Sequence, residues 1–162
     1  MSVLHARQTI REQVAQLITP LTTTAGRVYT TRHHRLDQSK LPCLLVYVLE
    51  ENVDRSAFSK FRTLERTLIV RIEGAARATS DLDDTLDSIG GEVEFALGGQ
   101  LPAGVEEFYL QNVQIDYTSE GDVPLGVIKM DWFCRYRQTI AQPEEAGDTI
   151  LVANAVLDGG TF

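Results

Sequence analysis

The chain has 162 residues, 43% hydrophobic and 23% charged, a composition typical of one soluble globular domain with a sizeable core. No apolar run approaches the roughly 20 residues that span a bilayer, and the N-terminus lacks the apolar stretch of a signal peptide, so we expect a cytosolic product without membrane contact. The net charge of −8 argues against general nucleic-acid binding, which needs clustered cations.

The chain begins with a predicted amphipathic helix over residues 3–18. Its apolar stripe consists of Val3, Ala6, Ile10, Val14, Leu17 and Ile18, which recur at helical spacing. Pro20 disfavours helical geometry in the residue before it, so the helix ends near Thr19. A short β-rich run over residues 27–31 then predicts a strand.

Two long strands follow. Residues 43–49 are continuously apolar, which predicts a central strand covered on both faces. Residues 50–61 are polar and predict a loop. Residues 62–73 alternate, which predicts a second strand. One face of that strand carries Leu64, Arg66, Leu68, Val70 and Ile72. The two strands therefore form a hairpin whose tip projects from the domain.

An acidic helix is predicted from Ser80 onward. Its apolar stripe consists of Leu82, Leu86, Ile89, Val93 and Leu97. Ser80 is the expected N-cap, and acidic residues in the first turn suit the helix dipole. The pair Gly90-Gly91 weakens a helix interior and indicates either a kink or close packing against the sheet. Gly98-Gly99 ends the helix.

Two strands complete the pattern. Residues 108–117 predict a strand with one common face, formed by Tyr109, Gln111, Val113, Ile115 and Tyr117. Residues 125–138 predict a strand with two distinct faces. Its apolar face consists of Ile128, Met130, Trp132, Cys134 and Tyr136, and its other face of Val127, Lys129, Asp131, Phe133, Arg135 and Arg137.

This order of elements predicts an α+β fold, a mainly antiparallel sheet with two helices packed on one face. We expect the domain to span residues 1–138, and residues 139–162 to form a linker and an apolar arm. The apolar octet of that arm, residues 150–157, has two interpretations. It is an edge strand of its own domain, or it adds to a neighbouring subunit.

Charge is segregated along the chain. Residues 1–77 hold 12 Lys or Arg and 7 Asp or Glu, whereas residues 78–128 hold 11 Asp or Glu and no Lys or Arg. A solvated acidic helix face explains this. So does a head-to-tail contact between a basic face and an acidic face of two subunits. The candidate acidic face consists of Asp81, Asp83, Asp84 and Asp87.

No motif indicates catalysis, a metal or a cofactor. The acids of residues 81–92 fit a calcium-loop frame poorly, because Leu86 stands where the frame needs glycine. His33 and His34 lack the spacing of zinc ligands relative to each other or to any cysteine. Cys43 and Cys134 are expected to be buried thiols, although two strands of one sheet could also bring them into a disulfide. We expect a protein that is not an enzyme.

The polar residues that remain suit a binding surface. The hairpin carries Arg55, Phe58, Lys60, Phe61 and Arg62, a set that fits either a protein contact or single-stranded nucleic acid, and we favour the protein contact. The last strand adds Lys129, Asp131, Arg135 and Arg137 as candidates for subunit contact. A lone acid such as Asp131 on a polar strand face is usually solvated.

Four segments carry a family resemblance: LPCLLVYVLE, RTLERTLIVRIEGAA, SDLDDTLDSIGGEVEFAL and VQIDYTSEGDVPLGVIKMDWFCRYRQ. In order and spacing the chain, over residues 1–138, resembles the tail terminator proteins of long-tailed, siphovirus-like phages, the lambda-type minor tail protein U family. Residues 139–162 have no counterpart in that pattern.

The resemblance implies a structural virion protein at the tail–neck junction, assembled in the host cytoplasm. Such a protein forms a homo-hexameric ring on the head-proximal end of the tail tube. It ends tube polymerisation at the length set by the tape measure, and it offers a surface to the head-completion or neck protein. DNA passes through the ring without specific binding. The alternatives are a head–tail connector of similar fold, and a small ligand-binding or enzymatic α+β domain.

Overall fold

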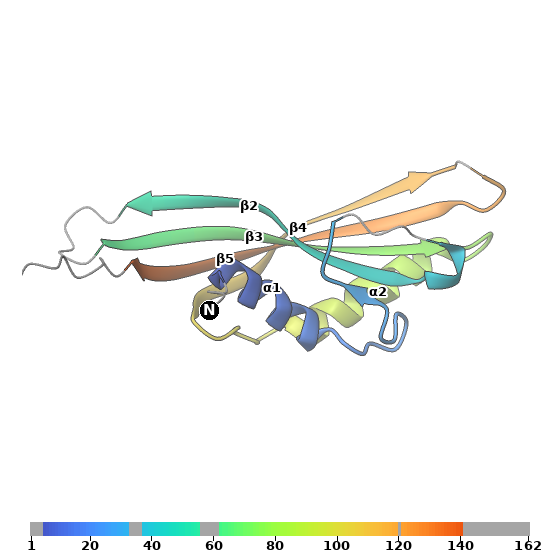
Figure 1. The fold of residues 1–162 in the computed structure, drawn as a ribbon. Coiled ribbons are helices and arrows are strands. Elements are labelled where there is room, and N and C mark those ends of the chain that lie inside the picture. Colours follow the sequence, from blue (N-terminus) through green and yellow to red (C-terminus); the bar gives the residue numbers. More distant parts are fainter. Residues whose placement is uncertain (1–4, 33–36, 56–61, 120, 141–162) are drawn as a thin grey trace, which may run out of the picture.

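The computed structural model describes residues 5–32, 37–55, 62–119 and 121–140. They form one five-stranded sheet with the strand order β1-β2-β3-β5-β4 and two helices beneath it (Figure 1). The elements are α1 (Ala6–Leu17), β1 (Val28–Tyr29), a 3-10 helix (Gln38–Lys40), β2 (Cys43–Arg55), β3 (Arg62–Arg77), α2 (Leu82–Leu97), β4 (Val105–Thr118) and β5 (Leu125–Ile140). Among these strands only the β1–β2 pair is parallel, so the predicted α+β fold with a mainly antiparallel sheet is confirmed.

β3 and β5 are the centre of the sheet. They pair over their full length, from Arg62 opposite Ile140 to Arg77 opposite Leu125. β2 lies between β1 and β3, so residues 43–49 belong to an inner strand, although β1 pairs with only two of them. Both faces of this strand are covered, as predicted, since Cys43, Leu44, Leu45 and Val46 are all buried.

β2 is longer than the apolar run predicts. Residues 50–55 were expected in a loop, but they continue the strand and pair with residues 64–69 of β3. A register shift between Val48 and Glu50 precedes this polar half. Cross-strand hydrogen bonds, which hydrophobicity does not report, hold it in the sheet. In Figure 1 the ends of β2 and β3 extend well beyond the helices.

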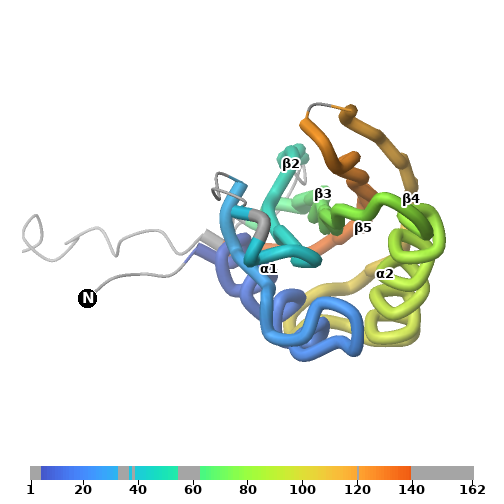
Figure 2. The backbone as a smooth tube through the Cα atoms, turned by 90° about the vertical axis from the view of Figure 1, so that its right-hand side faces the viewer, coloured from blue at the N-terminus to red at the C-terminus, as the bar shows by residue number. Residues whose placement is uncertain are grey.

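The core lies between the two helices and one sheet face. Figure 2 shows α1 and α2 side by side under the sheet. The predicted apolar rows are confirmed: Ile10, Val14 and Ile18 at α1, Leu86, Ile89, Val93 and Leu97 on α2, and Ile128, Met130, Trp132, Cys134 and Tyr136 on β5 are all buried. Leu17 of the predicted α1 stripe is 37% exposed, and Val3 lies outside the described residues.

Small residues let α2 lie close to the sheet. A Cβ at Gly90 would lie 2.9 Å from Ile128 Cδ1, and a Cβ at Gly74 would lie 2.7 Å from Ile89 Cγ2. Close packing therefore explains Gly90, whereas a Cβ added at Gly91 would meet nothing within 4 Å. The expected cap at Ser80 is wrong. The helix begins at Leu82, and Asp81 takes the cap position in a left-handed conformation without a side-chain cap bond.

β4 contains two irregularities that alternation does not predict. A register shift between Leu110 and Asn112 places Tyr109 opposite Phe133 but Val113 opposite Met130. Phe133 and Met130 are on different faces of β5. The expected common face of Tyr109 and Val113 is therefore wrong, because the extra residue of a bulge exchanges the two faces.

The remaining expectations concern cysteines, the membrane and the chain end. Cys43 and Cys134 are free and buried, and burial raises their pKa values to about 11 and about 12 respectively. No helix in the described ranges combines the length and apolarity needed to cross a bilayer. β5 reaches Ile140, and the predicted arm lies outside the described residues.

Candidate assembly surface

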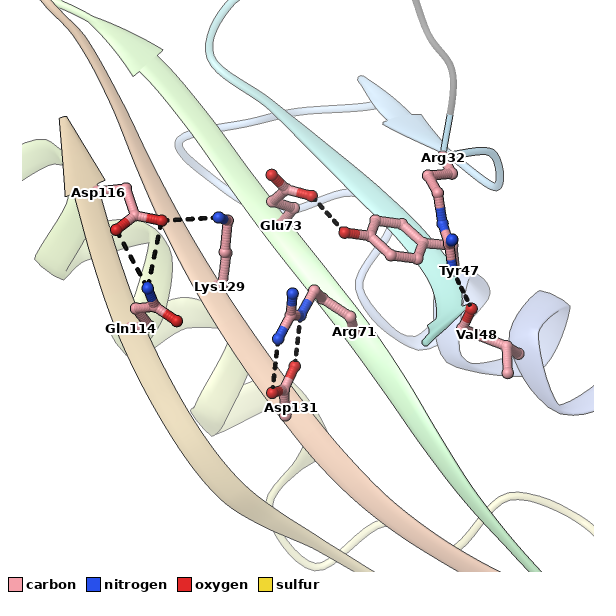
Figure 3. Close-up of polar contacts among 9 residues, drawn as sticks. All are labelled: Arg32, Tyr47, Val48, Arg71, Glu73, Gln114, Asp116, Lys129 and Asp131. Carbon is pink, nitrogen blue, oxygen red and sulfur yellow. Dashed lines mark hydrogen bonds and ion pairs between the residues drawn. The ribbon is translucent and has the colours of Figure 1, made fainter. Parts of the chain in front are cut away.

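The sheet face opposite the helices, here called the open face, carries the polar row of β5. Alternation along β3 and β5 points Arg71, Lys129 and Asp131 away from the core, and pairing across the strands brings them together. Figure 3 shows them with their partners on β2 and β4.

Asp131 is bound by Arg71 in a two-point ion pair. Arg71 Nε donates to Asp131 Oδ1 at 2.6 Å, and Nη2 donates to Oδ2 at 2.8 Å (Figure 3). Hydrogen bonding to Asp131 raises the pKa of Arg71 above its ordinary value. Asp131 is only 8% exposed, so the expectation of a solvated acid is wrong. The neighbouring strand supplies a cation that the sequence of β5 alone does not reveal.

Lys129 and Asp116 form a second pair on the open face. Lys129 Nζ donates to Asp116 Oδ2 at 2.7 Å, and Gln114 Nε2 donates to Asp116 Oδ1 at 3.2 Å (Figure 3). The hydrogen bond from Lys129 lowers the pKa of Asp116 below its ordinary value. This pair is more exposed than the first, so solvent screens it more strongly.

On β2, Tyr47 lies beside Arg71 and is the last residue of the polar row that crosses the open face. Its hydroxyl donates to Glu73 at 2.7 Å, and burial together with this hydrogen bond raises its pKa to about 12. The guanidinium of Arg32 lies over the Tyr47 ring at 4.8 Å and donates to the Val48 carbonyl at 2.7 Å (Figure 3). Residues from three segments thus fix this corner of the face.

Arg135 and Arg137 form a charged network toward the hairpin end of the sheet. Arg135 Nη2 lies 3.0 Å from Glu107 Oε2, and Arg137 lies 3.5 Å from Glu106 and 3.7 Å from Glu65. The two arginine side chains remain 40% and 59% exposed. Part of the charge segregation along the chain is therefore neutralised within the subunit, because β4 brings two glutamates of the acidic segment to the arginines of β5.

A partly buried ionic cluster, which the sequence did not suggest, lies on the helix side of β2. Glu51 accepts a hydrogen bond from the Tyr136 hydroxyl at 2.5 Å and lies 2.8 Å from Arg7 and 3.3 Å from Arg66. Burial raises the pKa of Glu51, but the Tyr136 hydrogen bond and the two arginine charges outweigh it and lower the pKa overall. Residues 50–61 were expected in a loop, which hid this role of Glu51.

The candidate acidic face lies at the start of α2. Asp81, Asp83, Asp84 and Asp87 are all exposed there. Asp83 accepts a hydrogen bond from the Tyr117 hydroxyl, which raises the pKa of that tyrosine. Leu82 packs near Gly126, so these acids lie at the β5 start, far from the hairpin end of the sheet. The four aspartates therefore lie together at this end of the molecule.

A basic pocket is the main feature that the sequence did not suggest. A cavity of about 440 Å³ lies between the start of α1, residues 30–32 and β2. Its cationic lining consists of Arg7, Arg11 and Arg32, with His5 beside them. Arg11 Nε is buried without a hydrogen-bond partner among the described residues. Segments that are far apart in the chain form the pocket, so no local motif marks it.

Several predicted residues lie outside this description. Phe58, Lys60 and Phe61 are not among the described residues, and the side chains of Arg55 and Arg62 are not described either. His33 and His34 are also outside. Within the described ranges no three His, Cys, Asp or Glu side chains gather closely enough to hold a metal ion.

Comparison with solved structures finds a similarity of fold. No protein-family model and no curated protein matches the chain. A chain of the virion of native gene transfer agent (GTA) particle superimposes with a TM-score of 0.54 and 14% sequence identity. The superposition covers 80% of this chain and 96% of that chain. The protein therefore shares its fold with a chain of that GTA virion particle.

Proposed function

We propose that the protein is a structural virion protein, a tail terminator that forms a ring at the head-proximal end of a phage-like tail tube. The observation that supports it best is the shared fold with a GTA virion chain, which extends over 96% of that chain. The order of elements in the tail terminator family, which the sequence resembles, agrees with the order observed here. Both observations support a structural virion protein.

The charged surfaces suit a ring. A closed ring uses two unlike faces of each subunit, because its interfaces are heterologous. The acidic face at the start of α2 and the basic pocket at the start of α1 are two such faces, with opposite charge on different elements. Complementary charge sets orientation and encounter rate more than affinity.

The proposed ring has several partners. The tube protein lies on one side of it, the head-completion or neck protein on the other, and the tape measure ends at it. DNA passes through the lumen without specific binding, since an acidic lumen repels phosphates. A lumen lined with Arg55, Lys60 and Arg62 would contradict this part of the proposal.

The test is the length of tails made without the protein. Particles from a producing strain that lacks it are imaged in negative stain. A terminator predicts overlong tails, because nothing stops the addition of tube subunits. Tails of normal length beside unattached heads would instead assign the protein as a head–tail connector. Normal, infectious particles would contradict a structural role in the tail.

The hairpin tip gives a second, local prediction. Phe58→Ala and Arg62→Glu should leave thermal unfolding nearly unchanged, because Phe58 lies between β2 and β3 in the sequence and Arg62 is the first residue of β3, at the end of its pairing with β5. Aromatic and arginine side chains dominate many protein interfaces, so each variant should impair tail joining. Joining is scored as the fraction of heads with tails after complementation. Normal tail joining by both variants would show that the hairpin tip is not part of the assembly surface.

A further inference from the structure

The outer edge of β4 is a strand edge without protection in its second half. Among the described residues, β4 is the last strand of the sheet and pairs only with β5. Both register shifts lie in its first half, before Asn112, and the strand contains no Lys or Pro. Bulges, prolines and lysines are the usual means by which edge strands avoid pairing with other chains. Residues 112–118 therefore form a regular edge that is open to a further strand.

The side chains beside this edge are apolar and exposed. Val113, Ile115 and Tyr117 alternate along the helix side of β4 and are 42%, 40% and 54% exposed. The charged residue of the segment, Asp116, points to the open face and is paired with Lys129. Such a row of β-branched and aromatic residues is stabilised by apolar neighbours on an adjacent strand.

The chain contains a segment that matches this edge. Residues 150–157, ILVANAVL, are eight residues without a charge. In an extended strand, both of its alternating rows contain apolar residues, so either row could lie beside Val113, Ile115 and Tyr117. We propose that residues 112–118 of one copy receive residues 150–157 of a second copy as an added strand. This inference rests on the proposed function, in which copies of the chain assemble with one another.

Reach favours a second copy over the same copy. Asn112 lies opposite Asp131, and β5 continues nine residues beyond Asp131 to Ile140. At about 3.3 Å per residue, the end of β5 is about 30 Å from the near end of the receiving edge. The nine residues 141–149 span at most about 30 Å when fully extended. Docking within one copy would require residues 141–149 to be fully extended, whereas docking on a neighbouring copy does not impose this requirement.

The test is a disulfide cross-link between two full-length chains. One carries Ile115→Cys and the other either Val152→Cys or Ala153→Cys, one from each alternating row, and they are mixed under mild oxidation; the native cysteines are buried. Strand addition holds the two thiols at a millimolar effective concentration, so the mixture should give at least about tenfold more cross-linked dimer than a control. The control pairs Val152→Cys with Phe95→Cys, because Phe95 is 91% exposed on α2.

The other outcomes are also decisive. Dimer yields equal to the control with both Val152→Cys and Ala153→Cys overturn the inference. A chain with both Ile115→Cys and Val152→Cys that cross-links only as a monomer overturns it too, in favour of docking within one copy. Both cross-linking results are independent of the tail-length experiment. That experiment, on particles made without the protein, tests the proposed function separately.

Discussion

The carboxylate of Asp131 is nearly buried on a sheet face that is otherwise polar. Two charge-assisted hydrogen bonds from Arg71 compensate its loss of solvent. Alternation along β5 places Asp131 correctly on the polar face, but nothing in that pattern identifies its partner 60 residues earlier. The pairing depends on the register between β3 and β5, which long-range contacts determine.

Removal of this carboxylate should be costly. Asp131→Ala leaves the Arg71 guanidinium, whose side chain is 18% exposed, without its counter-ion. We expect the free energy of unfolding in urea to fall by about 2–3 kcal/mol. The matched variant Asp116→Ala removes the exposed partner of Lys129 and should have a much smaller effect. Equal losses in the two variants would contradict the distinct role of Asp131.

Glu51 should make stability depend on pH in the acid range. Its pKa in the fold is lower than the ordinary 4.5, so its contribution is present above that value and is lost as pH falls through the lowered pKa. Glu51→Gln should therefore be less stable than the parent chain near neutral pH, and the difference should shrink as the solution is acidified below 4.5. Urea unfolding at several pH values measures it. A difference independent of pH would contradict the ionic role.

At the scale of elements, hydrophobic periodicity predicts the helices and the long strands well. The apolar rows of α2 and β5 were found because each alternates or repeats over many residues in contact with one core. Hydrophobic periodicity predicts the wrong strand bounds or faces where pairing with a neighbouring strand determines them instead. The polar half of β2 is held by β3, and the shift in β4 exchanges its faces after Leu110. For the same reason, the ionic cluster of Glu51 and the basic pocket could not be predicted.

The contact between α2 and the sheet gives an element-level prediction. Gly74→Ala places a methyl group 2.7 Å from Ile89 Cγ2, so we expect a loss of about 1–3 kcal/mol in unfolding free energy. Gly91→Ala meets no atom within 4 Å and should gain about 0.5–1 kcal/mol, because alanine is the better helix former. Thermal or urea unfolding measures both. A stabilised Gly74→Ala variant would show that α2 is not packed closely against β3.

At the scale of the molecule, the proposed ring depends on oppositely charged faces. Arg11→Glu in the basic pocket and Asp84→Arg on the acidic face should each weaken self-association, which native mass spectrometry measures. The chain with both substitutions should associate better than either single variant, because the exchanged charges again attract each other. Urea unfolding controls for damage to the fold. A double variant that associates more weakly than both single variants would show that these two faces do not contact each other.

The central claim is that copies of this protein form a ring at the end of the tail. A cryo-electron microscopy reconstruction of the neck of purified particles tests it most directly. The proposal predicts a closed ring of this fold, with six copies arranged head to tail, between the last layer of tube protein and the head-completion or neck protein. Its absence from that position, or its presence there as single copies without mutual contact, would contradict the claim.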